Sequence, residues 1–400
     1  MGRMQQERDN GIRWIMTALF VLFAFGYIVL FQRDLIALMQ ETWSHGQTHN
    51  NPLVTFVVAT TLLLLLQVGV RSLLDINGRW EAFSYLPSLM LLAFFTDVDT
   101  HTFCYQHAGK WITVFVLTVI GIYLLPRLGR MKYPDSKASL VTLLQPNLVT
   151  FVLGAVLCMA LSCHDAPLHM ELAAWRHAAS DEPDRVASVG RRSLETTPSL
   201  TALRNVALCR EGRAGDELFT LPQPYGVEGL GVDRYMRRGT RFGCEVFDAF
   251  VGAAPYGGEG VMDFCKRMAQ DDASPHYRDL YMAALLLDGQ LQTFARQFPP
   301  STLGDTLAPR HYREAWLLYE HLCPDSHLSY HDAALEPLLE ACLEIQAADT
   351  ASDGPGKASS AGEHLPSYAA TPEKEAENRR MLAFGDTYWH YYLTHFGSSE

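Results

Sequence analysis

Five long apolar stretches lie within the first 162 residues, and they constrain the fold more than any other feature of the chain. About 20 mainly apolar residues in a helix are long enough to cross the ~30 Å hydrocarbon core of a bilayer. The sequence therefore predicts an all-α protein whose residues 1–162 form a bundle of about five transmembrane helices. The expected spans are residues 14–31, 52–70, 83–98, 111–128 and 140–161.

The individual spans differ in how clearly they predict a crossing. A cleaved signal peptide is a rival for the first stretch, but no small-residue cleavage motif follows Phe31, so we expect an uncleaved anchor. The third stretch contains Pro87 and a short apolar core, so a re-entrant segment remains an alternative to a full crossing. Gln67 is the strongly polar residue inside the second span, where a helix–helix hydrogen bond is the simplest expectation.

The number of Lys and Arg residues alternates between high and low in the segments that flank and connect the spans. The N-terminal tail and the second and fourth loops carry nine of these residues, whereas the first and third loops carry two. Because cytoplasmic loops are enriched in Lys and Arg, this pattern predicts an integral membrane protein with a cytoplasmic N-terminus and an extracytoplasmic C-terminal domain. If residues 83–98 do not cross, the C-terminal domain would instead face the cytoplasm.

Residues 163–400 differ in charge from the first part of the chain. Their net charge is −14, against +2 for residues 1–162, which together give the −12 of the whole chain. An acidic domain of this kind is a poor nucleic-acid partner, because phosphate contacts need clustered Lys and Arg. Helical periodicity recurs about every 34 residues per helix pair, which favours a tetratricopeptide-like domain over residues 163–348. The expected helices are Leu168–Ala179, Arg185–Glu195, Leu200–Glu211, Phe242–Val251, Gly260–Gln270, Pro275–Phe298, Pro309–Leu322 and Tyr330–Ala348.

The C-terminal end combines a low-complexity stretch with an aromatic helix. Residues 349–372 are dominated by Ala, Ser, Gly, Pro and Thr and are predicted to be a disordered linker. Residues 373–400 are predicted to contain one amphipathic helix, which either docks on the helical domain or rests on the outer membrane surface. The aromatic residues that we consider for partner binding are Tyr225, in a Gly- and Pro-rich loop, and Tyr388, Trp389 and Tyr392.

One segment of the helical domain resembles a known family. It runs from Asn205-Val206-Ala207-Leu208 through Gly212 and Asp216–Phe219 to Pro222-Gln223 and Gly229-Leu230. This segment resembles uncharacterised multi-pass membrane proteins of Bacteroidetes-type bacteria with C-terminal tetratricopeptide-like helices. The resemblance implies the same architecture and a periplasmic location, and it implies no catalytic residue.

A polar loop is the strongest candidate for chemistry. Asp97 and Asp99 form a D-x-D pair there, and either carboxylate could hold a metal or act as a general base. Imidazole and thiol groups follow in the same loop and after the last span, and these are common zinc ligands. The candidate ligands are His101, Cys104, His107 and His164. Cys104 could alternatively pair with Cys163, and polar loop residues without chemistry remain the simpler interpretation.

The motif search favours a non-enzymatic protein without a cofactor. The sequence contains no H-E-x-x-H motif, P-loop, dinucleotide fingerprint, C-x-x-C motif or G-x-S-x-G elbow in its proper context. The leading hypothesis is an envelope scaffold that lies in the lipid bilayer and presents its helical domain to a protein or peptide partner. The alternative is a membrane enzyme, glycosyltransferase-like or metal-dependent, that uses the outward loop from Asp97 to His107.

Overall fold

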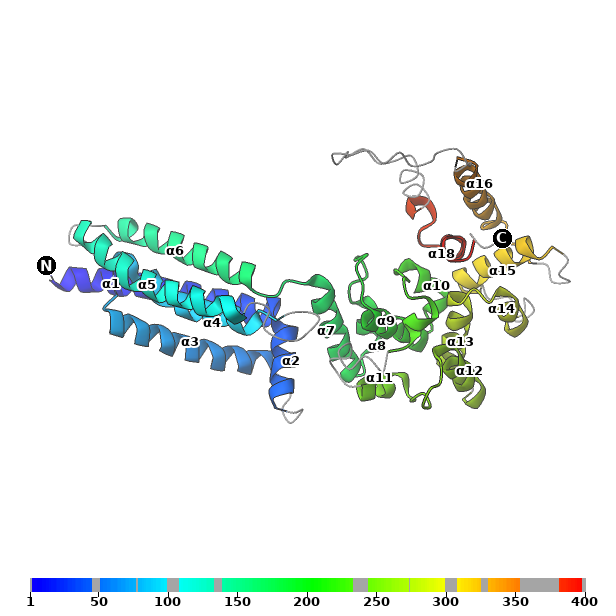
Figure 1. Ribbon diagram of the computed structural model, residues 1–400, viewed down its shortest axis with the longest axis horizontal. Coiled ribbons are helices and arrows are strands. Elements are labelled where there is room, and N and C mark those ends of the chain that lie inside the picture. The colour runs from blue at the N-terminus through cyan, green and yellow to red at the C-terminus, as the bar shows by residue number, and fades with distance from the viewer. Residues whose placement is uncertain are drawn as a thin grey trace. The chain divides into compact units, whose positions relative to one another are not determined.

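The computed structural model of the chain is helical throughout the residues that it describes (Figure 1). These residues form two compact units, Met1–Leu172 and Ala173–Glu400, and the division falls within helix α7. No β-strand occurs among them, so the all-α prediction is confirmed for this part of the chain. The described residues are 2–44, 51–76, 78–98, 108–132, 139–232, 244–272, 274–298, 308–324, 330–352 and 381–397.

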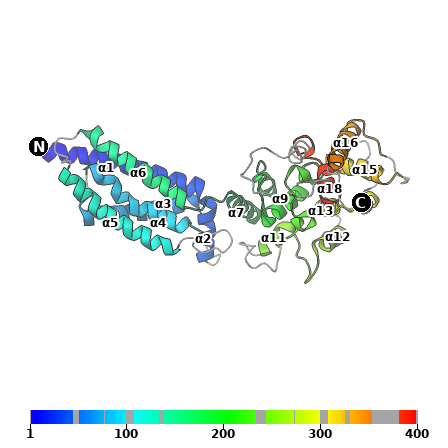
Figure 2. The same cartoon turned by 45° about the horizontal axis from the view of Figure 1, so that its top comes forward.

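The N-terminal unit is a bundle of long helices with shorter elements between them (Figure 2). Helix α1 continues without a break into a π-helical turn, η1, and a 3-10 helix, η2, leads into α4. The elements are α1 (Gly2–Phe25), η1 (Gly26–Phe31), α2 (Arg33–Trp43), α3 (Pro52–Leu74), η2 (Gly78–Tyr85), α4 (Leu86–Thr96), α5 (Ala108–Lys132) and α6 (Leu140–Leu161).

Three described helices have the length and apolar character that a membrane crossing requires: Gln6–Phe31, Pro52–Leu74 and Leu140–Leu161. They coincide with the first, second and fifth expected spans. The fourth expected span corresponds to a shorter apolar helix, Gly109–Leu124, inside α5. The third expected span is divided, because η2 occupies its beginning and α4 provides only 11 helical residues. The five-helix membrane bundle therefore remains a prediction beyond these three helices.

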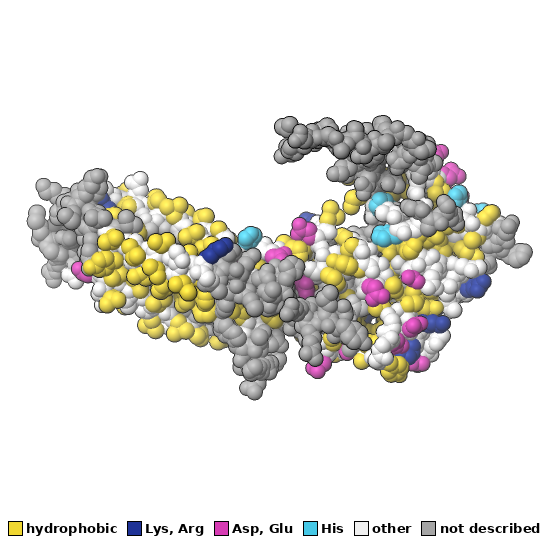
Figure 3. Space-filling model, viewed as in Figure 1, with side chains coloured by type: hydrophobic (Ala, Val, Ile, Leu, Met, Phe, Trp, Pro, Cys, Tyr) yellow, Lys and Arg dark blue, Asp and Glu magenta, His cyan; other side chains and the backbone are white. Residues whose placement is uncertain are grey.

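The N-terminal unit buries a few polar side chains within an apolar core and exposes many apolar side chains. Gln67, Glu81 and Asn147 are buried, whereas large apolar residues of α3, α5 and α6 are exposed along their helices (Figure 3). The Gln67 side-chain amide donates a hydrogen bond to Ser84 Oγ at 2.8 Å, which confirms the contact expected for this glutamine. Water-soluble helices also have an apolar inner face, but their outer face is polar.

One helix of the N-terminal unit was not predicted. Helix α2, Arg33–Trp43, follows η1 directly and buries Leu35 and Leu38. Its apolar residues form one short run, Leu35–Met39, and its length of 11 residues is too short for a span. The sequence analysis treated this stretch only as a connecting loop.

The C-terminal unit consists of short helices that follow one another closely (Figure 1). Helix α9 lies at its centre, with eleven of its thirteen residues buried. The elements are α7 (Ala166–Ala179), α8 (Pro183–Ser188), α9 (Pro198–Arg210), α10 (Ala214–Glu217), η4 (Leu218–Thr220), η5 (Gly226–Leu230), α11 (Cys244–Val251), α12 (Val261–Asp271), α13 (Pro275–Leu287), α14 (Leu291–Gln297), α15 (Arg310–Leu322), α16 (Glu336–Ser352) and α18 (Tyr388–His395).

Several expected helices are shorter or divided. The helix expected over Pro275–Phe298 is interrupted at Gly289, whose φ of 70° lies in the left-handed region that favours glycine. The last expected helix is also interrupted, at Gly385, where the chain turns tightly. A Cβ at this position would lie 2.3 Å from the Met381 carbonyl oxygen, so the turn needs a glycine. Helix α18 then begins after Thr387, whose hydroxyl accepts a hydrogen bond from the His390 N–H. Of the expected linker, residues 349–352 belong to α16, and the remainder lies outside the described residues.

Candidate functional site

The outward loop proposed for chemistry lies mostly outside the described residues, which include neither Asp99, His101, Cys104 nor His107. The same holds for the Cys104–Cys163 pairing. Asp97 is described and is buried, and its carboxylate accepts a hydrogen bond from Trp111 Nε1 at 2.6 Å. His164 is exposed, with its Nδ1 2.9 Å from the Ser162 carbonyl oxygen. The Asp97 carboxylate and the His164 imidazole thus lie against different groups.

The groups around Asp97 connect the ends of several helices. The Thr96 carbonyl accepts a hydrogen bond from the Cys163 N–H at 2.8 Å. The side-chain amide of Gln32, which is fully buried, donates to the Cys163 carbonyl at 2.7 Å. These bonds tie η1, α4 and the end of α6 together, so the polar groups at this end of the N-terminal unit serve its packing. Among the described residues, no group of three or more His, Cys, Asp and Glu side chains could hold a metal ion.

A buried carboxylate in the C-terminal unit is the most organised polar site that the structure describes. Glu314 lies on α15 and is fully buried. Two donors reach it from the preceding turn of the same helix: Arg310 Nε at 2.8 Å and His311 Nδ1 at 2.9 Å. Burying a carboxylate is costly unless it is paired and hydrogen-bonded, and here both conditions are met within one helix.

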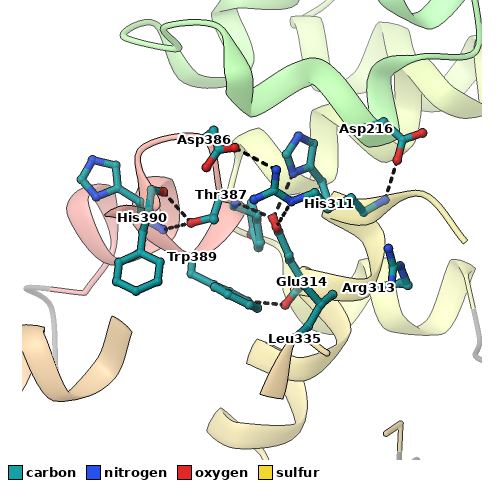
Figure 4. A network of polar contacts seen from close by, with 12 residues as sticks. Asp216, His311, Arg313, Glu314, Leu335, Asp386, Thr387, Trp389 and His390 are labelled. Atoms are coloured by element: carbon teal, nitrogen blue, oxygen red, sulfur yellow. Dashed lines mark hydrogen bonds and ion pairs between the residues drawn. The ribbon is translucent and has the colours of Figure 1, made fainter. Parts of the chain in front are cut away.

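The C-terminal strap, which we define as residues 381–397, completes this site (Figure 4). The backbone N–H of Tyr388 donates to Glu314 Oε2 at 2.8 Å, and Trp389 Nε1 donates to the Glu314 carbonyl oxygen at 2.7 Å. Because Tyr388 is the first residue of α18, the Glu314 carboxylate lies at the positive end of that helix dipole. Glu314 thus binds the strap through both its side chain and its main chain.

Arg310 links the strap to a second carboxylate. Its Nη1 lies 2.8 Å from Asp386 Oδ2, and its backbone N–H donates to Asp216 Oδ1 at 2.7 Å. The hydrogen bond from Arg310 lowers the pKa of Asp386, and the same bond raises the pKa of Arg310. Asp216 belongs to α10, so one arginine joins three elements that are far apart in the sequence.

Aromatic side chains form the apolar part of the contact. The ring of Phe219 lies 5.0 Å from the rings of both Tyr388 and Tyr391, and 5.1 Å from the imidazole of His311. Tyr391 Oη donates to the Leu287 carbonyl at the end of α13, at 2.7 Å. Burial raises the pKa of Tyr391 well above its usual value, so its phenol stays protonated and remains a donor.

The aromatic candidates for partner binding are largely occupied within the chain. Tyr388 and Trp389 are fully buried by the contacts between the strap and the rest of the C-terminal unit, and Tyr392 is half-buried. This arrangement corresponds to docking on the helical unit, one of the two expectations for the last helix. Tyr225 is half-buried, and its Oη donates to the Thr196 carbonyl at 3.5 Å. Tyr392 and Tyr225 therefore keep some surface for a partner.

The sequence analysis missed Glu314, Arg310 and His311. Their signal was present in the spacing, because residues three and four apart lie on the same face of a helix. The sequence predicted a helix over Pro309–Leu322 without assigning a role to its polar residues. Their partners on the strap lie more than 70 residues later, a separation that helical periodicity cannot bridge.

A second buried polar cluster surrounds α9 and overlaps the segment that carried the family resemblance. Arg204 of α9 is buried and donates to the Val189 and Gly190 carbonyls and to Thr196 Oγ1. Loss of solvent lowers the pKa of Arg204 to about 10. The side-chain amides of Asn205 and Gln223 bind each other twice, at 2.9 Å. These bonds hold the loops around α9, so this segment is defined by packing rather than by chemistry.

Comparisons with known proteins bear on the first two thirds of the chain. No curated protein and no solved structure matches the chain. A family described as a family of unknown function (DUF6057) matches residues 6–271, which include the N-terminal unit from residue 6 onward and the α9 cluster. The match agrees with the expectation of an uncharacterised family, and the Glu314 site lies beyond the end of the match. The chain therefore belongs to DUF6057, a family of unknown function.

Proposed function

We propose that this protein is a non-enzymatic envelope scaffold, anchored in the inner membrane by its N-terminal unit, that presents its C-terminal unit to a protein partner. The observation that carries the anchor is the exposed apolar surface of the N-terminal unit. Its exposed surface is apolar along α3, α5 and α6, and its buried interior holds Gln67, Glu81 and Asn147. A lipid bilayer favours this distribution, because unpaired polar groups are costly in hydrocarbon.

The proposed topology places the N-terminus in the cytoplasm and the C-terminal unit in the periplasm. It rests on the alternation of Lys and Arg and on five crossings. The exposed thiol of Cys323 offers a direct test. In intact cells with a permeabilised outer membrane, a maleimide that cannot cross the inner membrane should label wild type but not Cys323→Ser at that position. Labelling of Cys323 only after the inner membrane is opened would place the C-terminal unit in the cytoplasm.

The scaffold role is favoured over catalysis by what the buried ionisable groups contact. Glu314 binds donors of its own helix and main-chain and indole groups of the strap, and Arg204 binds main-chain carbonyls and a threonine hydroxyl. Asp97 binds the Trp111 indole. Each of these side chains is used to join elements of the chain. We further propose that the short helices form tetratricopeptide-like pairs, an architecture that commonly presents an extended binding surface.

The scaffold proposal is tested by crosslinking the tagged protein in its native membrane and identifying the captured molecules by mass spectrometry. Reproducible links from residues 173–400 to one envelope protein are expected, and deletion of these residues should remove both the links and the cellular function. The double change Asp97→Ala and Asp99→Ala provides the comparison. If it abolished function in a protein that accumulates and folds normally, while the deletion kept function, the scaffold proposal would fail and the enzyme alternative would stand.

A further inference from the structure

The strap binds a face that the rest of the C-terminal unit builds without it. We define this acceptor face as Phe219, Leu287, Arg310, His311 and Glu314. These residues come from η4, α13 and α15, and the elements that carry and support them pack against one another: α10 against α13 and α15, and α14 against α13 and α15. The acceptor face therefore has structural support that does not pass through the strap.

The central carboxylate of this face is also prepared without the strap. Arg310 and His311 precede Glu314 by four and three residues on α15, and both donate to its side chain. Their hydrogen bonds compensate for much of the desolvation of the carboxylate within one helix. What remains for an incoming segment is an acceptor that can receive a main-chain N–H, which any segment with a helix N-terminus can supply.

The strap shows what chemistry fits the acceptor face. An acidic residue, Asp386, pairs with Arg310, and the next residue, Thr387, caps a helix that starts there. Two aromatic residues follow, of which Tyr388 packs on Phe219 and Trp389 binds the Glu314 carbonyl. A third aromatic residue one turn later, Tyr391, binds the Leu287 carbonyl. Each of these five features makes a contact that another segment of the same pattern could reproduce.

We propose that the acceptor face is a peptide-binding site, and that the C-terminal strap is its resident ligand, which a partner segment of the same pattern displaces. The fitting segment has an acidic residue, a Ser or Thr cap, two aromatic residues and a third aromatic residue three positions after the first. This inference rests on the proposed scaffold function and names the chemistry of its partner.

The resting state is closed, because the strap competes from within the same chain. An intramolecular occupant acts at an effective concentration near the millimolar range, far above that of a free peptide at micromolar concentration. The strap also buries Phe384, Tyr388, Trp389 and Tyr391. A free peptide should therefore bind wild type poorly and should bind well only when the resident strap is weakened.

The test uses purified full-length protein in detergent and a labelled synthetic peptide of residues 381–397. The variant Asp386→Ala with Tyr391→Phe removes two polar anchors of the resident strap and leaves its buried aromatic rings in place. Each lost hydrogen bond weakens the resident strap several-fold, so the labelled wild-type peptide should bind this variant about tenfold more tightly than it binds wild type. A labelled peptide that carries the same two changes should lose the gain, because its own binding is weakened as much as that of the resident strap, and a scrambled peptide should bind none of these proteins.

Hydrogen exchange of the wild-type protein provides an independent measurement. The amides of α18 should exchange faster than those of α13, because the strap opens while the rest of the unit stays folded. The proposal is overturned if α18 exchanges only as slowly as α13, or if the weakened variant binds the labelled peptide no better than wild type does. Either result would make the strap a permanent part of the core.

These outcomes are separable from those of the scaffold proposal. Peptide binding is measured on purified protein, so it does not depend on the identity or presence of a cellular partner. Captured envelope proteins without peptide binding would support the scaffold and place its interface elsewhere on the C-terminal unit. Peptide binding without a captured partner would support the acceptor face as a peptide-binding site and contradict its proposed role in a cellular scaffold.

Discussion

The buried carboxylate of Glu314 accepts the backbone N–H of Tyr388 at 2.8 Å, across 74 residues of sequence. Arg310 and His311 hold the same carboxylate from the preceding turn of α15. A single side chain thus connects the internal packing of one helix with the start of another. The stability of the strap should depend on this carboxylate more than on any exposed charge nearby.

Replacing Glu314 by Gln should destabilise the C-terminal unit. The amide is neutral and cannot accept three donors as the carboxylate does, so the contact of the half-buried Arg310 with this side chain is weakened. We expect a loss of about 2–4 kcal/mol in the free energy of unfolding. Thermal unfolding of the purified full-length protein measures it, with Glu340→Gln on the exposed side of α16 as the matched control. Equal melting temperatures for the two variants would contradict this role of Glu314.

The ion pair between Asp386 and Arg310 predicts a dependence on pH. The hydrogen bond from Arg310 lowers the pKa of Asp386 in the folded protein. A carboxylate with a lowered pKa stabilises the fold above its unfolded pKa of about 3.9, and this contribution is lost as the pH falls through the folded pKa. The wild type should therefore melt above Asp386→Asn at pH 6, and the difference should shrink below about pH 4. A difference that stays constant between pH 6 and pH 3 would show that the ion pair does not contribute.

Much of the helical architecture followed from local patterns. The apolar runs predicted the helices around residues 14–31, 52–70 and 140–161, because length and apolarity suffice for that inference. Gln67 was expected to bond across helices, and its contact with Ser84 agrees. The breaks at Gly289 and Gly385 were not predicted, since the residues on either side of each glycine keep helical spacing.

The polar site escaped prediction for a different reason. Within α15, the spacing of Arg310, His311 and Glu314 is visible in the sequence, but similar spacings are common on exposed helix faces. What makes this group a site is burial under the strap, and that depends on tertiary contacts between residues more than 70 positions apart. The loop that carried most of the predicted chemistry, from Asp99 to His107, lies outside the described residues.

Asn147 should be essential to the packing of the N-terminal unit. Its side chain accepts a hydrogen bond from the Ala82 N–H at 2.7 Å and donates to the Gly78 carbonyl at 2.9 Å. Both partners belong to η2, so one asparagine of α6 holds the 3-10 helix in place. Asn147→Leu would leave these buried main-chain groups unpaired, and we expect a loss of about 2–4 kcal/mol. Thermal stability in detergent measures the effect, and Val152→Leu on the exposed side of α6 is the control.

A charge on the exposed side of α3 tests whether this helix crosses a membrane. Leu65 is 63% exposed near the middle of the helix, whereas Leu53 is 59% exposed at its beginning. Arginine at the centre of a span opposes insertion by about 2.5–3.5 kcal/mol, and near the end of a span its long side chain reaches the interface at lower cost. Leu65→Arg should therefore reduce the amount of protein in the membrane fraction more than Leu53→Arg does. If both variants accumulated like wild type, the exposed apolar face of α3 would not lie in lipid, and the anchor proposed for the N-terminal unit would have to exclude this helix.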